Sequence, residues 1–171
     1  VGVSKATNMS ELIAAANTAL AYDEWILIEE AIVGREIEVS VLGNQSARTS
    51  VPGEIIPGND FYDYNDKYID DGAQLLVPAP LTTLQTTEVQ QLALKIFSAL
   101  RCDGMARVDF FFEENGRGFL CNEVNTIPGF TPISMYPKLW QASGVEYPAL
   151  IDELMLLARQ RHSRRKRNTQ R

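Results

Sequence analysis

The fold of this 171-residue chain is decided by one stretch, GMARVDFFFEENGRGFLCNEVNTIPGFTPIS, which occupies residues 104–134. Within it, Arg107 and Asp109 are two residues apart, and so are Glu123 and Asn125. Side chains at positions i and i+2 of a strand point to the same face of a sheet. We therefore predict a hairpin with one polar face. Its other face is expected to be apolar and to present Ala106, Val108, Phe110 and Phe112.

The turn of this hairpin decides whether the polar face forms. The pair Asn115-Gly116 is typical of a two-residue turn. Such a turn would leave Glu123 on the wrong face, because a slip of one residue turns every side chain over. A shared face therefore requires an odd-length loop or a bulge. We expect a three-residue loop over residues 114–116, with Gly116 left-handed and Glu123 across from Arg107.

The polar side chains of this face suit a site for a metal ion and phosphate. Asp109, Glu123 and Asn125 offer hard oxygen ligands, which fit Mg²⁺ or Mn²⁺ and not zinc. The guanidinium of Arg107 either pairs with these carboxylates or holds a transferring phosphate or a developing oxyanion. From spacing alone, a solvated polar sheet face is an equal alternative to a metal site.

Two loops supply further candidates. Gly129 follows the second strand and either brings its backbone N–H to a substrate oxygen or forms an ordinary tight turn. The segment 57–73 lacks helical or strand periodicity and contains Lys67 and Tyr68. These two residues either close over a phosphate or are an exposed lysine and a packing tyrosine.

A nucleotide site, if the chain has one, is neither of the Walker type nor of the Rossmann type, because neither glycine motif is present. Glu29 ends one apolar stretch, and Glu36 begins the next. Carboxylates and backbone groups in such a linker hold adenine and ribose in many nucleotide sites. By itself this pattern is a weak indication.

Composition excludes several classes of protein. The content of 45% hydrophobic residues indicates a buried core, and no apolar run approaches the roughly 20 residues that cross a bilayer. Two cysteines and the lack of a signal peptide favour the cytoplasm. The chain has one histidine, His162, which argues against a histidine-based triad and against a zinc site. We expect no membrane partner.

Charge is concentrated at the end of the chain. The net charge is −6, yet residues 159–171 contain seven Lys or Arg and no acid, which leaves nine bases against 22 acids elsewhere. An acidic body argues against nonspecific nucleic-acid binding. We expect residues 1–158 to form the folded part and residues 159–171 to be a basic, solvated, disordered tail.

Hydrophobic periodicity predicts helices and mostly antiparallel strands without strict alternation, which indicates an α+β fold and not a Rossmann sheet. The predicted helices cover residues 10–22, 86–100, 137–142 and 147–161. Besides the hairpin, the predicted strands cover residues 25–29, 35–42, 49–56 and 75–77.

Several segments together resemble the D-alanine–D-alanine ligases, which belong to the ATP-grasp superfamily. The matching segments are VGVSK at 1–5, GREIEVSVLGN at 34–44, PGEI at 52–55, FYDYNDKY at 61–68, GMARVDFFF at 104–112 and NEVNTIPGFTPISMYPKLW at 122–140. The resemblance extends from residue 1 to about residue 158. It implies an ATP-grasp fold from which the family's N-terminal domain is absent.

The resemblance also implies a role for each candidate residue. Asp109, Glu123 and Asn125 resemble the ligands of two Mg²⁺ (or Mn²⁺) ions, and Arg107 with the Gly129 amide resembles the pair that stabilises the tetrahedral intermediate. Other positions match the adenine linker (Glu29, Glu30, Ile32), the ribose carboxylate (Glu36), the γ-phosphate lysine (Lys67), the tyrosine near the first D-alanine (Tyr68) and the receptors of the second D-alanine's carboxylate (Ser134, Met135).

The implied activity is ATP-dependent joining of two D-alanines through an acyl phosphate, for peptidoglycan precursors, by an enzyme that is a homodimer at full length. Alternatives are a D-alanine–D-serine or D-lactate ligase and a non-catalytic nucleotide-binding fragment. Tyr68 disfavours D-lactate, because the dipeptide-forming enzymes have tyrosine there. The family's phosphate-binding lysines are missing, so we expect the isolated chain not to turn over.

Overall fold

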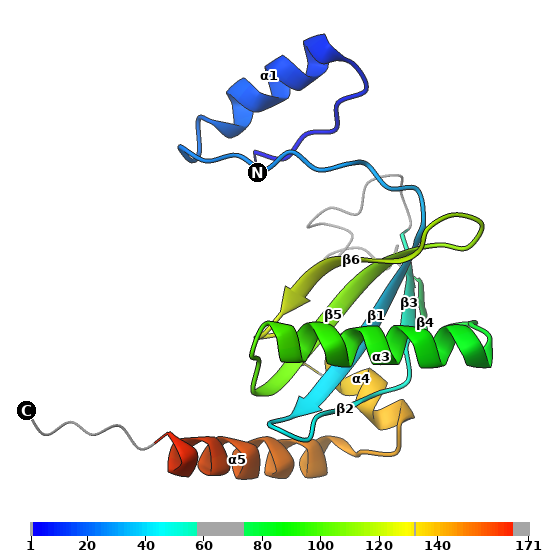
Figure 1. Cartoon of the computed structure of the whole chain (residues 1–171), viewed down its shortest axis with the longest axis vertical. Coiled ribbons are helices and arrows are strands. Elements are labelled where there is room, and N and C mark those ends of the chain that lie inside the picture. The colour runs from blue at the N-terminus through cyan, green and yellow to red at the C-terminus, as the bar shows by residue number, and fades with distance from the viewer. Residues whose placement is uncertain (1, 58–73, 132, 166–171) are drawn as a thin grey trace, which may run out of the picture. The chain divides into compact units, whose positions relative to one another are not determined.

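The computed structural model describes residues 2–57, 74–131 and 133–165, and the chain divides into two compact units, residues 1–33 and residues 34–171 (Figure 1). The first unit contains helix α1, Met9–Ala19. Its N-cap is Asn8, whose side chain accepts the N–H of Glu11 at 3.0 Å. The Glu11 carboxylate accepts from the backbone N–H and hydroxyl of Thr7, both at 2.7 Å, and not from the N–H of Asn8, so only half of a capping box forms.

The predicted strand over residues 25–29 is wrong. This segment has no strand pairing, and the side chains of Trp25 and Leu27 are 81% and 79% exposed. A strand needs a hydrogen-bonded neighbour, and the described residues of the first unit contain no second strand. This apolar segment therefore has no regular secondary structure and stays largely exposed within this unit.

The second unit is built on a six-stranded sheet with the order β4-β3-β1-β5-β6, and β2 pairs with the end of β1. All its pairings are antiparallel. The strands are β1 (Arg35–Gly43), β2 (Arg48–Thr49), β3 (Gly53–Ile56), β4 (Gln74–Leu76), β5 (Gly104–Glu113) and β6 (Gly118–Asn125).

The single strand expected over residues 49–56 divides into β2 and β3. Between them, the Ser50 hydroxyl accepts the backbone N–H of Ser40 at 3.1 Å. Pro52 follows and has no N–H to donate to a neighbouring strand. Both features interrupt the regular ladder, so β2 and β3 contact separate parts of β1.

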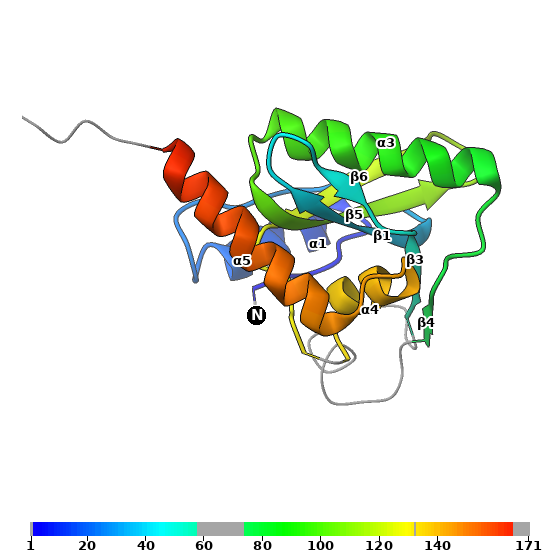
Figure 2. The ribbon, with the colours of Figure 1, turned by 90° about the horizontal axis from the view of Figure 1, so that it is seen from below.

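Helix α3, Thr83–Ala99, covers one face of the sheet (Figure 2). It begins three residues before the predicted start, because Thr82 and Gln85 form a reciprocal capping box. The main core lies beneath it and contains the apolar face predicted for the hairpin. Its fully buried members are Ile37, Val39, Val41, Val89, Ala93, Phe97, Ala106, Val108, Phe110 and Phe112.

Helices α4 (Met135–Ala142) and α5 (Tyr147–Arg164) lie on the opposite face of the sheet (Figure 2). One core on this side joins Leu42 to Tyr136, Trp140 and Leu150, and a smaller one joins Ile55 to Met135 and Leu139. The strands also turn their polar side chains to this face. The candidate site therefore lies on the α4 side of the sheet.

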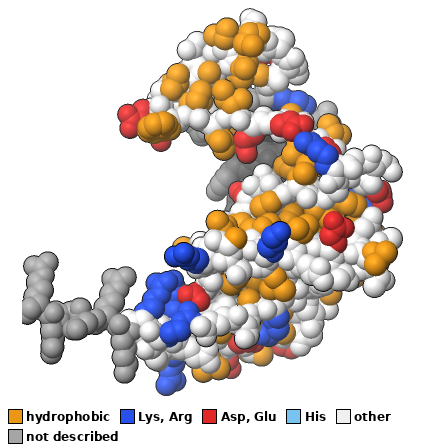
Figure 3. Space-filling model, in the orientation of Figure 1, with side chains coloured by type: hydrophobic (Ala, Val, Ile, Leu, Met, Phe, Trp, Pro, Cys, Tyr) orange, Lys and Arg blue, Asp and Glu red, His pale blue; other side chains and the backbone are white. Residues whose placement is uncertain are grey.

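The helix predicted over residues 147–161 is confirmed and continues to Arg164, so residues 159–164 do not belong to a disordered tail. Arg161 and Arg164 pair with the carboxylate of Asp103, at 3.0 and 2.8 Å. These ion pairs fix the end of the helix against the loop that precedes β5. Lys and Arg side chains gather near the end of α5 (Figure 3). Among the described residues, no helix is long and apolar enough to cross a membrane.

Candidate active site

The β5–β6 hairpin forms a bulge, as the shared-face argument requires. Asp109 pairs with Glu123, but the next pair is Phe110 with Cys121, so Asn122 is an extra residue in β6. Our expected turn is wrong, because the loop has four residues, 114–117, and the positive φ (77°) belongs to Gly118. With a four-residue loop and no bulge, the side chains of Glu123 and Asn125 would point to the opposite face of the sheet. The bulge restores them to the face of Arg107 and Asp109.

The register opposite Arg107 is also corrected. Asn125, and not Glu123, pairs with Arg107, while Glu123 lies directly across from Asp109. All four side chains nevertheless share the face predicted from their spacing. The sequence identified the correct face but not the correct partners.

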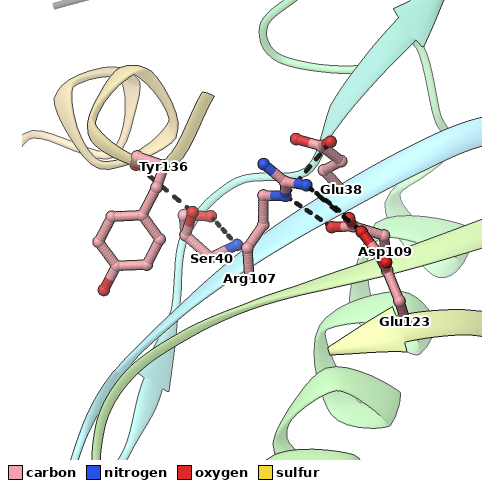
Figure 4. Close-up of polar contacts among 7 residues, drawn as sticks. Glu38, Ser40, Arg107, Asp109, Glu123 and Tyr136 are labelled. Carbon is pink, nitrogen blue, oxygen red and sulfur yellow. Dashed lines mark hydrogen bonds and ion pairs between the residues drawn. The ribbon is translucent and has the colours of Figure 1, made fainter. Parts of the chain in front are cut away.

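Arg107 is the centre of the polar cluster (Figure 4). Its Nε and Nη2 donate to the two carboxylate oxygens of Asp109 at 2.7 and 2.6 Å. The same guanidinium lies 3.2 Å from an oxygen of Glu38 and 3.9 Å from an oxygen of Glu123. Only 14% of the Arg107 side chain is exposed, against 54% for Glu123. The cluster is buried on the β1 side and open on the β6 side.

Glu38 is the site residue that the sequence analysis missed. The β1–β5 register places it directly opposite Asp109, and its side chain is only 6% exposed. Glu38, Asp109 and Glu123 therefore form a row of carboxylates across β1, β5 and β6. Alternation in β1 indicates the face of Glu38, but its pairing with a strand about 70 residues later has no local signal.

Electrostatics keep this arginine charged. Burial alone would lower the pKa of Arg107, but the hydrogen bonds to Asp109 and the charges of Glu38, Asp109 and Glu123 outweigh it, so the pKa is raised. Within the part of the chain that the structure describes, the carboxylates of Glu38, Asp109 and Glu123 all lie near the guanidinium of Arg107. Like charges directly opposite on neighbouring strands repel. A bound cation would relieve the repulsion between these carboxylates.

The residues present fit an oxygen-coordinated cation. Asp109 and Glu123 face each other across the strands, and Asn125 adds an amide oxygen on the same face. Among the described residues, no three His, Cys, Asp or Glu side chains are grouped closely enough to hold a metal by themselves. The donor set is consistent with an ion that takes its remaining ligands from a substrate.

A second cluster forms in the loop that joins β6 to α4. The Ser134 hydroxyl accepts the backbone N–H of Thr131 at 3.0 Å and lies 2.8 Å from the Thr131 hydroxyl. A Cβ at Gly129 would lie 2.9 Å from the same Ser134 oxygen, so the glycine is required for this approach. Tyr147 donates its hydroxyl to the carbonyl of Phe130 at 2.8 Å and anchors the loop to α5.

Ser134 is the N-cap of α4, and Met135 begins the helix. The Met135 side chain is 5% exposed and packs with Ile55 and Leu139, so it cannot reach a substrate. Only the backbone of Met135 can serve the predicted role. The first N–H groups of a helix attract anions such as a carboxylate.

The remaining predicted residues belong to other segments of the chain. In the first unit, Glu29 and Glu30 are exposed and Ile32 is half-buried. Glu36 belongs to β1 and faces the same side of the sheet as Glu38. Lys67 and Tyr68 lie outside the described residues.

Comparison with protein families gives one match that covers most of the chain. Residues 1–156 match the family described as "D-ala D-ala ligase C-terminus". The chain belongs to this family. The ligase B of Clostridium tetani is 52% identical over 158 residues, and the D-alanine–D-alanine ligase of Chlorobaculum parvum is 55% identical over the same length. Both alignments cover 92% of this chain but only 44% and 43% of the relatives, so the chain spans less than half of their length.

Solved structures of D-alanine ligases share the fold of this family member. The enzyme of Coxiella burnetii matches with a TM-score of 0.83 at 42% identity, over 94% of this chain and 42% of that one. The VanG D-Ala:D-Ser ligase of Enterococcus faecalis matches with a TM-score of 0.81 at 35% identity, over 91% of this chain and 45% of that one. The Bacillus anthracis ligase complexed with ATP matches with a TM-score of 0.81 at 29% identity, over 97% of this chain and 53% of that one. The expected ATP-grasp architecture is confirmed.

Proposed function

We propose that this chain supplies the metal- and phosphate-binding half of an ATP-dependent ligase that joins two D-alanines into D-alanyl-D-alanine. The product would enter peptidoglycan precursors in the cytoplasm. The family match and the relatives' names support this reaction. The observation that carries the proposal is the opposed pair of Asp109 and Glu123 beside the buried Arg107.

The first step would transfer the γ-phosphoryl group of ATP to the carboxylate of the first D-alanine. Two anions must meet, so cationic groups have to offset their repulsion. Asp109, Glu123 and Asn125 would hold two Mg²⁺ or Mn²⁺ ions, which neutralise phosphate charge when bound. Lys67 would reach the γ-phosphate, and Glu36 would hold the ribose. The adenine would contact the linker residues, Glu29, Glu30 and Ile32.

In the second step, the amine of the second D-alanine would attack the acyl phosphate. The Arg107 guanidinium and the Gly129 amide would stabilise the oxyanion of the tetrahedral intermediate. The α4 N-terminus, with the Ser134 hydroxyl and the Met135 backbone, would bind the carboxylate of this amino acid. Tyr68 would contact the first D-alanine. At full length, the enzyme would be a homodimer.

A D-alanine–D-serine ligase is the second candidate, because the VanG D-Ala:D-Ser ligase has the same fold over 91% of this chain. The two activities differ only in the side chain of the second amino acid. A hydroxymethyl group in place of a methyl group would need a polar partner near the second subsite. Direct competition between D-alanine and D-serine separates the two.

Nucleotide binding by the chain itself is the first test. Isothermal titration calorimetry of the 171-residue chain with ATP should show ATP binding that requires Mg²⁺ and is lost in Glu123→Ala. Glu114→Ala is the matched control, because Glu114 lies in the loop of the same hairpin, away from the site. Equal binding with EDTA, or unchanged binding in Glu123→Ala, would contradict the metal face.

Turnover needs a longer protein. We would replace the matching C-terminal segment of the Clostridium tetani ligase with this chain and measure ADP release that depends on D-alanine. The hybrid should be active, the Asp109→Asn hybrid should lose at least about a hundredfold in rate, and the isolated chain should release no ADP. Turnover by the isolated chain would contradict our expectation that it cannot act alone. Faster ADP release with added D-serine would favour the second candidate.

A further inference from the structure

The two oxygens of Asp109 are already occupied. Arg107 holds both of them, at 2.7 and 2.6 Å, in a bidentate pair. A carboxylate in this geometry is among the strongest partners that a guanidinium finds in proteins. A cation that takes Asp109 as a ligand draws on the same oxygens and repels the neighbouring guanidinium, so it weakens the pair between Asp109 and Arg107. The guanidinium needs another partner if it is displaced.

Water is a poor replacement, because the Arg107 side chain is only 14% exposed. Leaving a buried charge without a partner is strongly unfavourable. Glu38 lies 3.2 Å from Nε of Arg107 on the side away from β6, and its own side chain is 6% exposed. It is directly opposite Asp109 in the sheet, so it flanks the guanidinium without sharing the open side of the cluster.

We propose that Glu38 is a positioning residue for Arg107: it retains the guanidinium when Asp109 turns to a metal ion. This inference rests on the proposed function, since it concerns the same site. Glu38 would not bind the metal or the substrate. It would let Asp109 bind a metal ion while Arg107 stays charged and in position to stabilise the oxyanion of the tetrahedral intermediate.

A role of Glu38 through Arg107 predicts a different result from a direct charge effect on the metal or an effect on folding. If Glu38 acts through Arg107, its removal should weaken metal binding only when Arg107 is present. If its charge attracts the metal directly, or if it merely supports the fold, its removal should have the same effect in both backgrounds. A double-mutant cycle measures this difference.

The experiment is a Mn²⁺ titration of the 171-residue chain, with free Mn²⁺ measured by electron paramagnetic resonance. Glu38→Gln should weaken Mn²⁺ binding about tenfold, because the guanidinium loses one of its ion-pair partners. In the Arg107→Met background, the same substitution should change the affinity less than about twofold. The matched control is Glu54→Gln, because Glu54 is a buried carboxylate of the same sheet that pairs with Arg35. This control should leave Mn²⁺ binding unchanged.

A measurement on the unaltered chain covers the case in which a variant does not fold. The Arg107 Nε–H signal in ¹⁵N-edited spectra should stay protected from solvent exchange when Mg²⁺ is added. Loss of protection would overturn the role of Glu38, as would an equal effect of Glu38→Gln in both backgrounds. A chain that binds no Mn²⁺, or whose binding is the same in Asp109→Asn, would overturn the proposed metal face and the inference with it.

Discussion

Glu123 should contribute almost nothing to the stability of the metal-free chain, although it is proposed to be essential for metal binding. The contrast is with its cross-strand neighbour, Asp109, whose removal should be costly. We expect Glu123→Gln to change the free energy of unfolding by less than about 1 kcal/mol and Asp109→Asn to lower it by about 2–4 kcal/mol. Both substitutions preserve the shape of the side chain and remove its charge.

The difference follows from the distances. The Arg107–Glu123 separation of 3.9 Å is worth about 4 kcal/mol of attraction at an effective dielectric constant of about 20. Glu123 also faces Asp109, and cross-strand partners about 5 Å apart repel each other by about 3 kcal/mol at the same dielectric constant. Solvent screens both terms, because 54% of the Glu123 side chain is exposed. Asp109 instead makes two short, buried, charge-assisted hydrogen bonds.

The assay is urea unfolding in EDTA, followed by tryptophan fluorescence. Trp140 is 1% exposed and reports on the second unit, whereas Trp25 is 81% exposed and should change little. The midpoint of unfolding should move in Asp109→Asn and stay in Glu123→Gln. The reasoning would be refuted by a loss above about 2 kcal/mol in Glu123→Gln with no loss in Asp109→Asn.

Three further predictions test the structure around the site. Tyr136→Phe removes a 3.0 Å hydrogen bond from a fully buried hydroxyl to a carbonyl of β1, and should lower the free energy of unfolding by about 1–2 kcal/mol in a denaturant titration. Arg117 lowers the pKa of Glu113 to about 2, from the ordinary 4.5, mainly through its side-chain hydrogen bond. Because the folded pKa is depressed, this ion pair supports the hairpin above pH 4.5 and is lost as the pH falls toward 2; a carboxyl titration by NMR should return to about 4.5 in Arg117→Gln. Gly129→Ala would put a Cβ 2.9 Å from the Ser134 hydroxyl oxygen, so it should displace this hydroxyl and raise the KM for the second amino acid in the hybrid enzyme, with ATP binding unchanged as the check on folding.

The faces of the strands could be predicted from the sequence, because alternation is a local property. The residues of β5 that pack beneath α3 and those that line the polar face were assigned correctly. The partners across the strands could not be predicted in this way. The opposition of Glu38 and Asp109 depends on which strands become neighbours, and no short segment encodes that choice.

The two wrong elements have tertiary causes. Residues 25–29 have the composition of a buried strand but have no strand beside them within the first unit, so they remain extended. Residues 159–164 have the composition of a solvated tail but continue α5, because Asp103 binds Arg161 and Arg164. In both cases, composition describes the segment correctly and the contacts decide its structure.

Because Asn122 is an extra residue in β6, the face to which Glu123 points depends on the number of residues in this strand. A deletion of one residue within β6, between Gly118 and Glu123, would turn Glu123 away from the site, unless the same deletion removed the bulge. Related proteins with one residue fewer in this part of β6 should therefore have an unbulged second strand. Insertions in the loop that leave the pair of Glu113 and Gly118 in place should leave the site intact. The hairpin tip can then vary in length during evolution, or accept an engineered reporter. The number of residues in β6 near Asn122 cannot vary in this way.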